Sequence, residues 1–287
     1  MLSTGVVVVT RNRRDTLLRT LDRLCALPER PPIVVVDNGS LDGTTAAVRR
    51  AHPAVRVICL AHNAGGGARV MGAEALDTSL VAFSDDDSWW APGALATASR
   101  LFELHQRLGL LAARIVVGEE ERLDPTCVAM RESPLPPDPD LPGPPVLGFL
   151  ACGAIVRREA FVAAGGFEPR LGIGGEERLL ALDLAAAGWK LAYVDSIVAH
   201  HHPPGVGPQP GRRATELRNE LWTAWLRRPL RSAAARTAAL TRAALAEGAL
   251  VAPLRALAGL PWVIRERRVL PEGVERAARR LDAAEAR

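Results

Sequence analysis

Short apolar runs alternate with amphipathic stretches through the first ninety residues of the chain. The apolar runs are rich in β-branched residues and predict buried strands at Val6–Thr10, Ile33–Val36, Val55–Leu60 and Leu80–Ser84. Apolar residues three or four positions apart predict helices between them, over Leu17–Leu24, Thr44–Arg50 and Arg69–Leu76. Because strands and helices alternate, we expect an α/β fold with a mostly parallel central sheet flanked by helices and joined by right-handed crossovers.

The second half of the chain changes pattern twice. Residues 131–146 hold seven prolines and predict an irregular loop. Leu179–Ala187 predicts a helix that stops at Gly188, and Leu191–Val194 predicts a further strand. From Arg212 onward the chain is rich in Ala, Arg and Leu and predicts helices to its end. We therefore expect an α/β domain over residues 1–205 and a C-terminal helical extension over residues 206–287.

Composition narrows the class of protein. The chain has 287 residues, 48% of them hydrophobic and 24% charged, which is enough for a core and excludes wholesale disorder. Only 4% are aromatic, which disfavours a nucleic-acid binder with base-stacking platforms. The formal net charge of +4 is a mild excess, which we interpret as modest attraction to anionic ligands or anionic lipid headgroups.

Cysteines and termini suggest the compartment. The four cysteines have no CxxC spacing, which argues against a zinc knuckle or a disulfide scaffold and favours a reducing environment. The first residues carry no basic segment typical of a signal peptide, and no uncharged stretch of 18 apolar residues occurs. We expect a cytoplasmic protein.

Polar clusters follow the predicted strands, where the ligands of parallel sheets bind. Asp37 can accept an N–H from a nucleotide base or hold a ribose hydroxyl, but taken alone it is better explained as a turn cap. The glycine loop Asn63–Arg69 leads into a helix, and Arg69 can pair with phosphate. Such a loop is by itself usually structural.

The three aspartates at 85–87 are the strongest chemical signal. Adjacent carboxylates repel one another, so the cluster is costly unless a cation neutralises it. In an extended segment Asp85 and Asp87 share one side and Asp86 faces the other. Carboxylate oxygens suit Mg²⁺ or Mn²⁺, and because the cluster follows an apolar strand we favour a metal site over a solvated acidic turn.

Two further clusters contain titratable groups. Glu176 and Glu177 follow two glycines, and either provides a general base or simply complements a helix N-terminus. His200, His201 and His202 could add an imidazole to a metal, although at most two of them can face one site in a strand. Taken singly, each histidine is more often a surface residue.

The chain resembles the family 2 glycosyltransferases. The order and spacing match at Val6–Asn12, Val34–Thr44, Asn63–Gly72, Asp85–Asp87 followed by Trp90 and Pro92, and Gly175–Glu177. The most specific stretches are the Val-Asp-Asn-Gly-Ser-Leu-Asp-Gly-Thr segment and the aspartate cluster. The resemblance covers roughly residues 5–205 and implies the GT-A (nucleotide-diphospho-sugar transferase) fold, with inversion of the anomeric configuration.

The resemblance also implies a role for each matched position. Nucleotide binding is implied for Thr10, Arg11, Asn12, Asp37, Asn63, Gly66, Arg69 and Asp85. Mn²⁺ or Mg²⁺ would be held by Asp85 and Asp87, with His202 preferred over His200 as an additional ligand. The acceptor would contact Trp90, Cys152 and Gly153.

The catalytic base is implied to be Glu177. Family members usually have Glu-Asp where this chain has Glu176-Glu177, and a glutamate reaches one methylene farther, so Glu176 stays open as an alternative. The base would deprotonate an acceptor hydroxyl, which attacks the anomeric carbon in one displacement.

Partners follow from this resemblance. We expect a UDP-, dTDP- or GDP-linked sugar donor, a saccharide, lipid-linked or small-molecule acceptor, and no nucleic acid. For the C-terminal helices, peripheral contact with the inner face of a membrane and homodimerisation are both open. The alternative function is a non-catalytic sugar-nucleotide-binding or scaffolding subunit. A sugar-nucleotide pyrophosphorylase is disfavoured, because Thr10–Arg14 lacks the glycine-rich activating loop.

Overall fold

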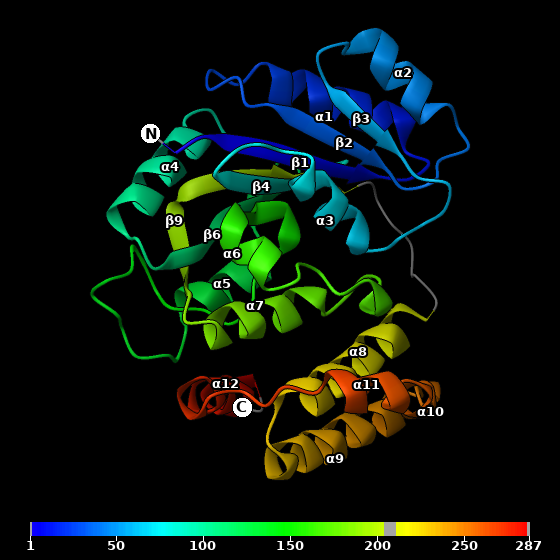
Figure 1. Ribbon diagram of the computed structural model, residues 1–287, viewed down its shortest axis with the longest axis vertical. Coiled ribbons are helices and arrows are strands. Elements are labelled where there is room, and N and C mark those ends of the chain that lie inside the picture. The colour runs from blue at the N-terminus through cyan, green and yellow to red at the C-terminus, as the bar shows by residue number, and fades with distance from the viewer. Residues whose placement is uncertain (1, 204–210, 286–287) are drawn as a thin grey trace.

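A nine-stranded sheet flanked by helices forms the centre of the described chain (Figure 1). The computed structural model describes residues 2–203 and 211–285. The strand order is β3-β2-β1-β4-β8-β6-β9-β5, and β7 pairs with β6. The strands are β1 Thr4–Thr10, β2 Ile33–Asp37, β3 Arg56–Cys59, β4 Leu80–Asp85, β5 Ser88–Trp90, β6 Leu108–Val117, β7 Arg122–Leu123, β8 Ala154–Arg157 and β9 Lys190–His201.

The first half of the sheet is parallel, as the alternation of strands and helices predicts. Strands β3, β2, β1 and β4 pair in parallel register, and the helices α1, α2 and α3 connect them. These helices span Arg14–Cys25, Thr44–Ala51 and Gly67–Glu74. The valines of β1 and β2 are almost all fully buried, which explains why these strands appear in the sequence as continuous apolar runs.

The second half of the sheet is mixed. Strand β8 is antiparallel to both β4 and β6, β5 is antiparallel to β9, and β6 and β9 are parallel. The sequence pattern did not specify β6 or β8, because a fully buried apolar run such as Leu108–Val117 does not distinguish a strand from a buried helix. Strand β9 is also longer than the predicted Leu191–Val194 and includes the first two of the three histidines.

Five helices surround or extend this part of the chain. They are α4 Ala94–Leu104, α5 Pro125–Arg131, α6 Arg158–Ala163, α7 Glu176–Ala186 and, after the segment outside the described residues, α8 Arg212–Arg227. The stretch predicted as an irregular loop at 131–146 contains no strand and no helix after α5 ends at Arg131. Helix α7 begins at Glu176, directly after the glycines 174 and 175 and three residues before the predicted start at Leu179.

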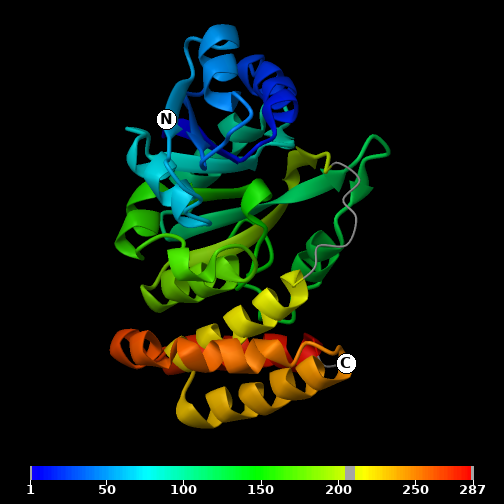
Figure 2. The ribbon, with the colours of Figure 1, turned by 90° about the vertical axis from the view of Figure 1, so that its right-hand side faces the viewer.

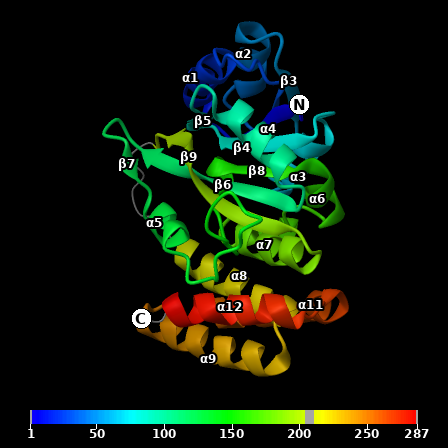
Figure 3. The same cartoon turned by 90° about the vertical axis from the view of Figure 1, so that its left-hand side faces the viewer.

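The C-terminal helices form a separate layer at the end of the molecule farthest from α1 and α2 (Figures 1 and 2). After α8 they are α9 Leu230–Ala246, α10 Val251–Ala258, α11 Leu260–Glu266 and α12 Glu272–Glu285. Leu171 and Leu179 join the apolar cluster of α8, and Leu182 of α7 packs with Leu270 and Ala278. In Figure 3, α7 lies at the side of the α/β part that is next to α8 and α12. The layer is therefore packed onto the α/β part through two apolar clusters.

Two expectations concern this region. The predicted domain boundary at residues 205 and 206 lies outside the described residues, and the division into two domains stays a prediction. Within residues 2–203 and 211–285, every helix is too short or too polar to cross a lipid bilayer.

Candidate functional site

The carboxyl ends of three parallel strands bring the polar residues together. Thr10 of β1 lies opposite Asp37 of β2, and Val9 lies opposite Asp85 of β4. Because neighbouring parallel strands end at the same edge of a sheet, the segments after these strands meet there. This edge holds most of the residues that the sequence singles out.

The turn after β4 is organised by one arginine. Arg13 Nε lies 3.2 Å from Asp86 Oδ1, and Arg13 Nη2 donates to Asp87 Oδ2 at 3.0 Å. Thr10 Oγ1 donates to Asp86 Oδ2 at 3.0 Å. The expected alternation of the three aspartates assumed an extended chain, but β4 ends at Asp85 and the next two residues form a turn. Asp86 and Asp87 therefore share the same guanidinium.

The pKa values of the two carboxylates of this turn are shifted in opposite directions. Burial raises the pKa of Asp86 to about 7, although the charge of Arg13 opposes it. Burial also acts to raise the pKa of Asp87, but the hydrogen bond and charge of His201 and the charge of Arg13 outweigh it, so that pKa is lowered. His201 Nε2 lies 3.4 Å from Asp87 Oδ1. At neutral pH, Asp87 is thus ionised and Asp86 is partly protonated.

A buried arginine links the aspartates to the two glutamates. Arg69 of α3 donates from Nη2 to Asp85 Oδ1 at 2.6 Å, and its Nη1 lies 3.8 Å from Glu176 Oε1. Glu176 is 1% exposed, and within the described chain its Oε2 has no hydrogen-bond partner. Burial, followed by repulsion from Glu177, raises the pKa of Glu176 to about 8. Glu176 is therefore a mostly protonated group at neutral pH.

The glycine loop is held close to the loop that precedes α7. The Gly66 N–H donates to the Gly172 carbonyl at 3.0 Å, and a Cβ on Gly65 would lie 2.9 Å from Gly172 Cα. Asn38 Oδ1 accepts from the Ala64 N–H at 2.7 Å, and Asn38 Nδ2 donates to Asn63 Oδ1 at 2.8 Å. The glycine loop thus needs small residues for this approach, whether or not it also meets a ligand.

Asp37 is fully occupied by its own turn. Its Oδ1 accepts from the Ser40 N–H at 2.9 Å, its Oδ2 accepts from Thr45 Oγ1, and the residue is 1% exposed. These contacts match the turn-cap interpretation of Asp37. Contact between Asp37 and a nucleotide base stays a prediction.

The segment after β1 is tied to the turn after β2. The Asn12 N–H donates to Ser40 Oγ at 2.9 Å, and the Leu41 N–H donates to Asn12 Oδ1 at 2.8 Å. Asn12 has a positive φ of 53°, a conformation that asparagine tolerates better than most residues. Arg11 is exposed beside it, so this segment offers a basic group at the edge of the site.

The histidines at the end of β9 divide between two faces. His201 faces Asp87, whereas the ring of His200 stacks on Trp89 with centroids 5.4 Å apart and that of His202 lies 4.6 Å from Trp89. The family resemblance implies that His202, or else His200, approaches the metal. Because side chains alternate along an extended segment, the structure instead turns His201 toward the aspartates.

The acidic residues fit a metal site that the donor completes. Among the described residues, no three His, Cys, Asp or Glu side chains are arranged as a metal-binding group. Arg69 bonds Oδ1 of Asp85 and Arg13 bonds Oδ2 of Asp87. Each of these two carboxylates therefore has one other oxygen that can serve as a metal ligand. Mg²⁺ commonly uses one or two carboxylates together with substrate phosphates and water. The donor set present here therefore fits Mg²⁺ or Mn²⁺ when a diphosphate is bound.

The predicted acceptor residues lie in the core. Trp90 is 0% exposed, Cys152 is buried with a pKa raised by burial, and a Cβ on Gly153 would lie 2.6 Å from Ile115 Cγ1. A buried ring has no free face for a sugar, so these placements do not fit direct acceptor contact. Their apolar and small character instead serves the packing between β6 and the start of β8.

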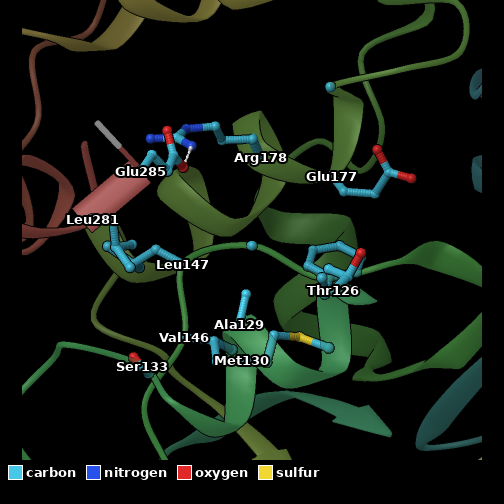
Figure 4. Close-up of a pocket in the computed structure, with 13 residues that line it drawn as sticks. Thr126, Ala129, Met130, Ser133, Val146, Leu147, Glu177, Arg178, Leu281 and Glu285 are labelled. Carbon is cyan, nitrogen blue, oxygen red and sulfur yellow. Dashed lines mark hydrogen bonds and ion pairs between the residues drawn. The ribbon is translucent and has the colours of Figure 1, made fainter. Parts of the chain in front are cut away.

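An open cavity lies beside Glu177 instead (Figure 4). Its volume is about 270 Å³, and Glu177 of α7 and Thr126 of α5 lie near each other on one wall. Leu281 and Glu285 of α12 lie on another wall, where Arg178 Nη1 donates to Glu285 Oε1 at 2.8 Å. The apolar side chains of the lining are Ala129, Met130, Val146, Leu147, Phe149 and Leu281. The cavity thus combines an apolar surface with one half-buried carboxylate.

Helix α8 holds the loop that positions the glutamates. Asn219 is 0% exposed and donates from Nδ2 to the carbonyls of Leu171 at 2.8 Å and Gly174 at 2.5 Å. These bonds fix residues 171–174, directly before Glu176 and Glu177. The C-terminal helices therefore contribute to the geometry of the site as well as to packing.

Sequence reasoning missed three of these residues. Arg13 lies next to the matched segment at 10–12, so its basic side chain after a strand was an available signal. His201 could have been found by continuing the strand through the histidines, since alternation separates it from its neighbours. Asn219 gave no signal, because a polar residue on an amphipathic helix does not reveal a contact with a distant loop.

Comparison with known sequences identifies a family. The family model described as "Glycosyl transferase family 2" matches residues 5–163 of this chain. The N-acetylglucosaminyl-diphospho-decaprenol L-rhamnosyltransferase of Mycobacterium tuberculosis is 28% identical over 271 residues, covering 79% of this chain and 87% of the relative.

Solved structures share the fold. S. aureus TarS 1-349 in complex with UDP-GlcNAc gives a TM-score of 0.62 at 16% identity, covering 78% of this chain and 66% of that one. The mannosyltransferase PcManGT from Pyrobaculum calidifontis, in complex with GDP-Man and Mn²⁺, gives 0.56 at 18% identity, with coverages of 99% and 86%. GalNAc-T7 with UDP, GalNAc and Mn²⁺ gives a TM-score of 0.61 at 19% identity. The match covers 79% of this chain but only about half (48%) of the GalNAc-T7 chain. The α/β architecture is thus that of the GT-A proteins, as expected.

Proposed function

The chain belongs to glycosyl transferase family 2, and from this premise we propose that it is an inverting glycosyltransferase with Glu177 as its general base. It uses a nucleotide-linked sugar as donor, in keeping with its family and its relatives. We assign the catalytic domain to residues 1–205 and a helical extension to residues 206–287.

The different surroundings of Glu176 and Glu177 support Glu177 as the general base. Glu176 is enclosed between Arg69 and the glycine loop, and burial raises its pKa to about 8. Glu177 is half-buried and lines the open cavity beside α5 and α12. A general base must reach the hydroxyl whose proton it takes, and of these two glutamates Glu177 is the one that lines an open cavity.

The donor is placed at the edge formed by β1, β2 and β4. Asp85 and Asp87 are the residues that would hold Mn²⁺ or Mg²⁺ there, together with the donor diphosphate. When bound, the cation offsets the charge that develops on the leaving nucleoside diphosphate. Arg13 pairs with Asp87 and Arg69 with Asp85, which fixes the positions of the two carboxylates.

The reaction is then a single displacement. Glu177 accepts the proton of an acceptor hydroxyl, whose oxygen forms a bond to the anomeric carbon while the bond to the diphosphate oxygen breaks on the opposite face. The protonated Glu177 and the nucleoside diphosphate are the remaining products. The loop fixed by Asn219 orients the base.

For the acceptor, we propose a saccharide linked to a polyprenyl diphosphate. The relative from Mycobacterium tuberculosis has an acceptor of this class in its name. The apolar lining of the cavity beside Glu177 is compatible with an acceptor that carries apolar groups. The donor nucleotide stays open among uridine, deoxythymidine and guanosine diphosphates.

Matched variants at the two glutamates test this assignment. Glu177→Gln is expected to lower kcat by about 10²–10⁴-fold while donor binding, measured by calorimetry, changes less than about twofold. Glu177→Asp should retain more activity than Glu177→Gln, and Glu176→Gln should affect kcat far less than Glu177→Gln. The readout is acceptor-dependent release of nucleoside diphosphate. If Glu176→Gln abolished turnover and Glu177→Gln did not, the base would be Glu176 instead.

A further inference from the structure

The segment formed by α10 and α11 carries an exposed apolar stripe. Gly259 separates the two helices, and its φ of −85° and ψ of −6° belong to the turn between them. At about 100° per residue Leu250, Leu254 and Leu257 fall within about 60° of one another on α10, and Ile264 is exposed on α11. Their side chains are 51%, 68%, 53% and 71% exposed. We call these four residues the α10–α11 stripe.

The opposite side of the same segment is already occupied. Ala252, Ala256 and Val263 are at most 2% exposed and belong to the apolar cluster of α8. The segment is therefore apolar on two opposite sides, one packed within the protein and one facing outward. Such a face is not required for the packing of the described chain.

Exposed apolar residues are concentrated here rather than scattered. Of the 14 large hydrophobic side chains that are exposed in the described chain, six lie between Leu245 and Ile264. Single exposed apolar residues are normal, but a contiguous set marks a surface that meets another apolar or interfacial phase.

Charge distinguishes between the partners that could cover the stripe. The whole chain carries +4, but residues 206–287 contain 16 arginines and 8 acidic residues, which gives this part +8 and the preceding part −4. Within the described residues, Arg255 and Arg268 are exposed and have no ion-pair partner; Arg255 lies about 140° around α10 from Leu250, so it is beside the stripe rather than part of its face. A second copy would bring the same positive charge to this face, whereas an anionic lipid surface would neutralise it.

We propose that the α10–α11 stripe rests on an anionic membrane surface, with its leucine and isoleucine side chains among the lipid headgroups and arginines at the lipid phosphates. The described helices cannot cross a bilayer, so the contact is peripheral and reversible. This inference does not rest on the proposed reaction, because it needs only the surface of the C-terminal helices. It would place the enzyme where a lipid-linked acceptor resides.

Flotation with vesicles tests the proposal directly. The full chain is mixed with vesicles of phosphatidylglycerol and phosphatidylcholine in equal parts, and with vesicles of phosphatidylcholine alone. Binding to the mixed vesicles is expected to be at least about tenfold stronger than to the neutral ones and to weaken with added salt. Failure of the folded native chain to bind the anionic vesicles would overturn the proposal.

A pair of double variants identifies the surface. Leu254→Glu/Ile264→Glu is expected to weaken vesicle binding at least about tenfold. Leu104→Glu/Leu230→Glu is the matched control, because its targets are 76% and 77% exposed, lie outside the stripe and add the same charge. It should stay within about threefold of the native chain. Equal losses in the two double variants would mean that the stripe has no special role.

The competing occupant is a second copy of the chain. Sedimentation equilibrium without vesicles is expected to give the same molecular mass for the native chain and the stripe variant. A native dimer that the stripe variant converts to monomer would overturn the proposal and make this face a protein interface. Asp87→Ala should bind vesicles like the native chain, so a failure of the proposed reaction remains distinguishable from a failure of membrane contact.

Discussion

At the scale of single residues, two adjacent glutamates differ in their surroundings more than in their chemistry. Glu176 begins α7 under the glycine loop, whereas Glu177 lies at the wall of the cavity lined by α5 and α12. The helix places consecutive side chains about 100° apart, so a step of one residue separates a buried position from an accessible one. This separation underlies our proposal that Glu177 is the catalytic base and that Glu176 has a structural role beside Arg69.

Replacing Glu176 by glutamine should change how stability depends on pH. The pKa of Glu176 is raised in the folded state from 4.5 to about 8, so between these values the folded chain holds a proton that the unfolded chain has lost. The contribution of Glu176 is thus most favourable below pH 4.5 and is lost as the pH rises toward 8. We compare the free energy of unfolding of Glu176→Gln with that of the native chain at each pH. The difference between the two proteins should shift in favour of the variant by about 1–3 kcal/mol from pH 5 to pH 8.

Urea denaturation of both proteins at pH 5 and pH 8 measures this effect. Glu119→Gln is a suitable control, because that carboxylate is exposed in the turn between β6 and β7. A difference between native and Glu176→Gln proteins that does not vary with pH would contradict the raised pKa.

Site residues were predictable where they follow strands. Asp85 and Asp87 come directly after an apolar run, and their place at the carboxyl edge follows from the α/β pattern. The acceptor side was not predictable in this way. Trp90, Cys152 and Gly153 lie in the core, and the cavity is built from four segments that meet only in three dimensions.

At the scale of elements, helix α8 acts on the site through the loop before α7. Asn219 bonds two carbonyls of that loop, and Gly66 bonds a third from the other side. The loop contains three residues with positive φ, namely Gly172, Gly174 and Gly175. A glycine-rich segment of this kind is held in one conformation by its partners rather than by its own preferences.

Asn219→Ala should loosen this loop. It removes the buried donor of the Gly174 carbonyl and leaves the Leu171 carbonyl with Arg218 alone, and we expect the free energy of unfolding to fall by about 1–3 kcal/mol. We also expect kcat to fall several-fold with little change in donor KM, because the loop positions Glu177 rather than the donor.

Thr223→Val on the same helix is the matched control. Thr223 is 3% exposed, and within the described chain its hydroxyl has no hydrogen-bond partner, so valine should be tolerated with near-native stability and kcat. If Asn219→Ala lost stability but kept the native kcat, α8 would have no positioning role.

The parallel half of the sheet was predictable because its strands and helices alternate with clear turns. Strands β6 and β8 were not, since their pairing joins residues far apart in sequence and includes antiparallel neighbours. For the same reason β9 appeared shorter in the sequence than it is. Its continuation to His201 depends on pairing with β5 and β6, which no local pattern encodes.

At the scale of the whole molecule, the C-terminal layer is attached by apolar packing and by buried ion pairs. Arg228 is 4% exposed and pairs with Glu275 at 2.5 Å and with Asp282 at 2.8 Å. These pairs join the end of α8 to α12, whose Leu281 and Glu285 line the cavity beside Glu177. The cavity therefore depends on how α12 is held.

Glu275→Gln should destabilise the chain by about 2–4 kcal/mol, because it removes one charge of a buried pair and leaves Arg228 with a single carboxylate. Glu272→Gln, whose partner Arg276 is exposed, should cost less than about 0.5 kcal/mol. Thermal denaturation of the two variants provides the comparison. Equal losses would show that burial of the Arg228 pair does not contribute to stability.

The central claim is that the edge formed by β1, β2 and β4 binds a nucleotide-sugar donor. The most direct measurement is calorimetric titration of UDP, dTDP, GDP and CDP with and without Mn²⁺. The account predicts that one of them binds in a metal-dependent manner and that Asp87→Ala weakens its binding at least about tenfold. Absence of binding by all four to the folded protein would contradict the account and favour a non-catalytic role.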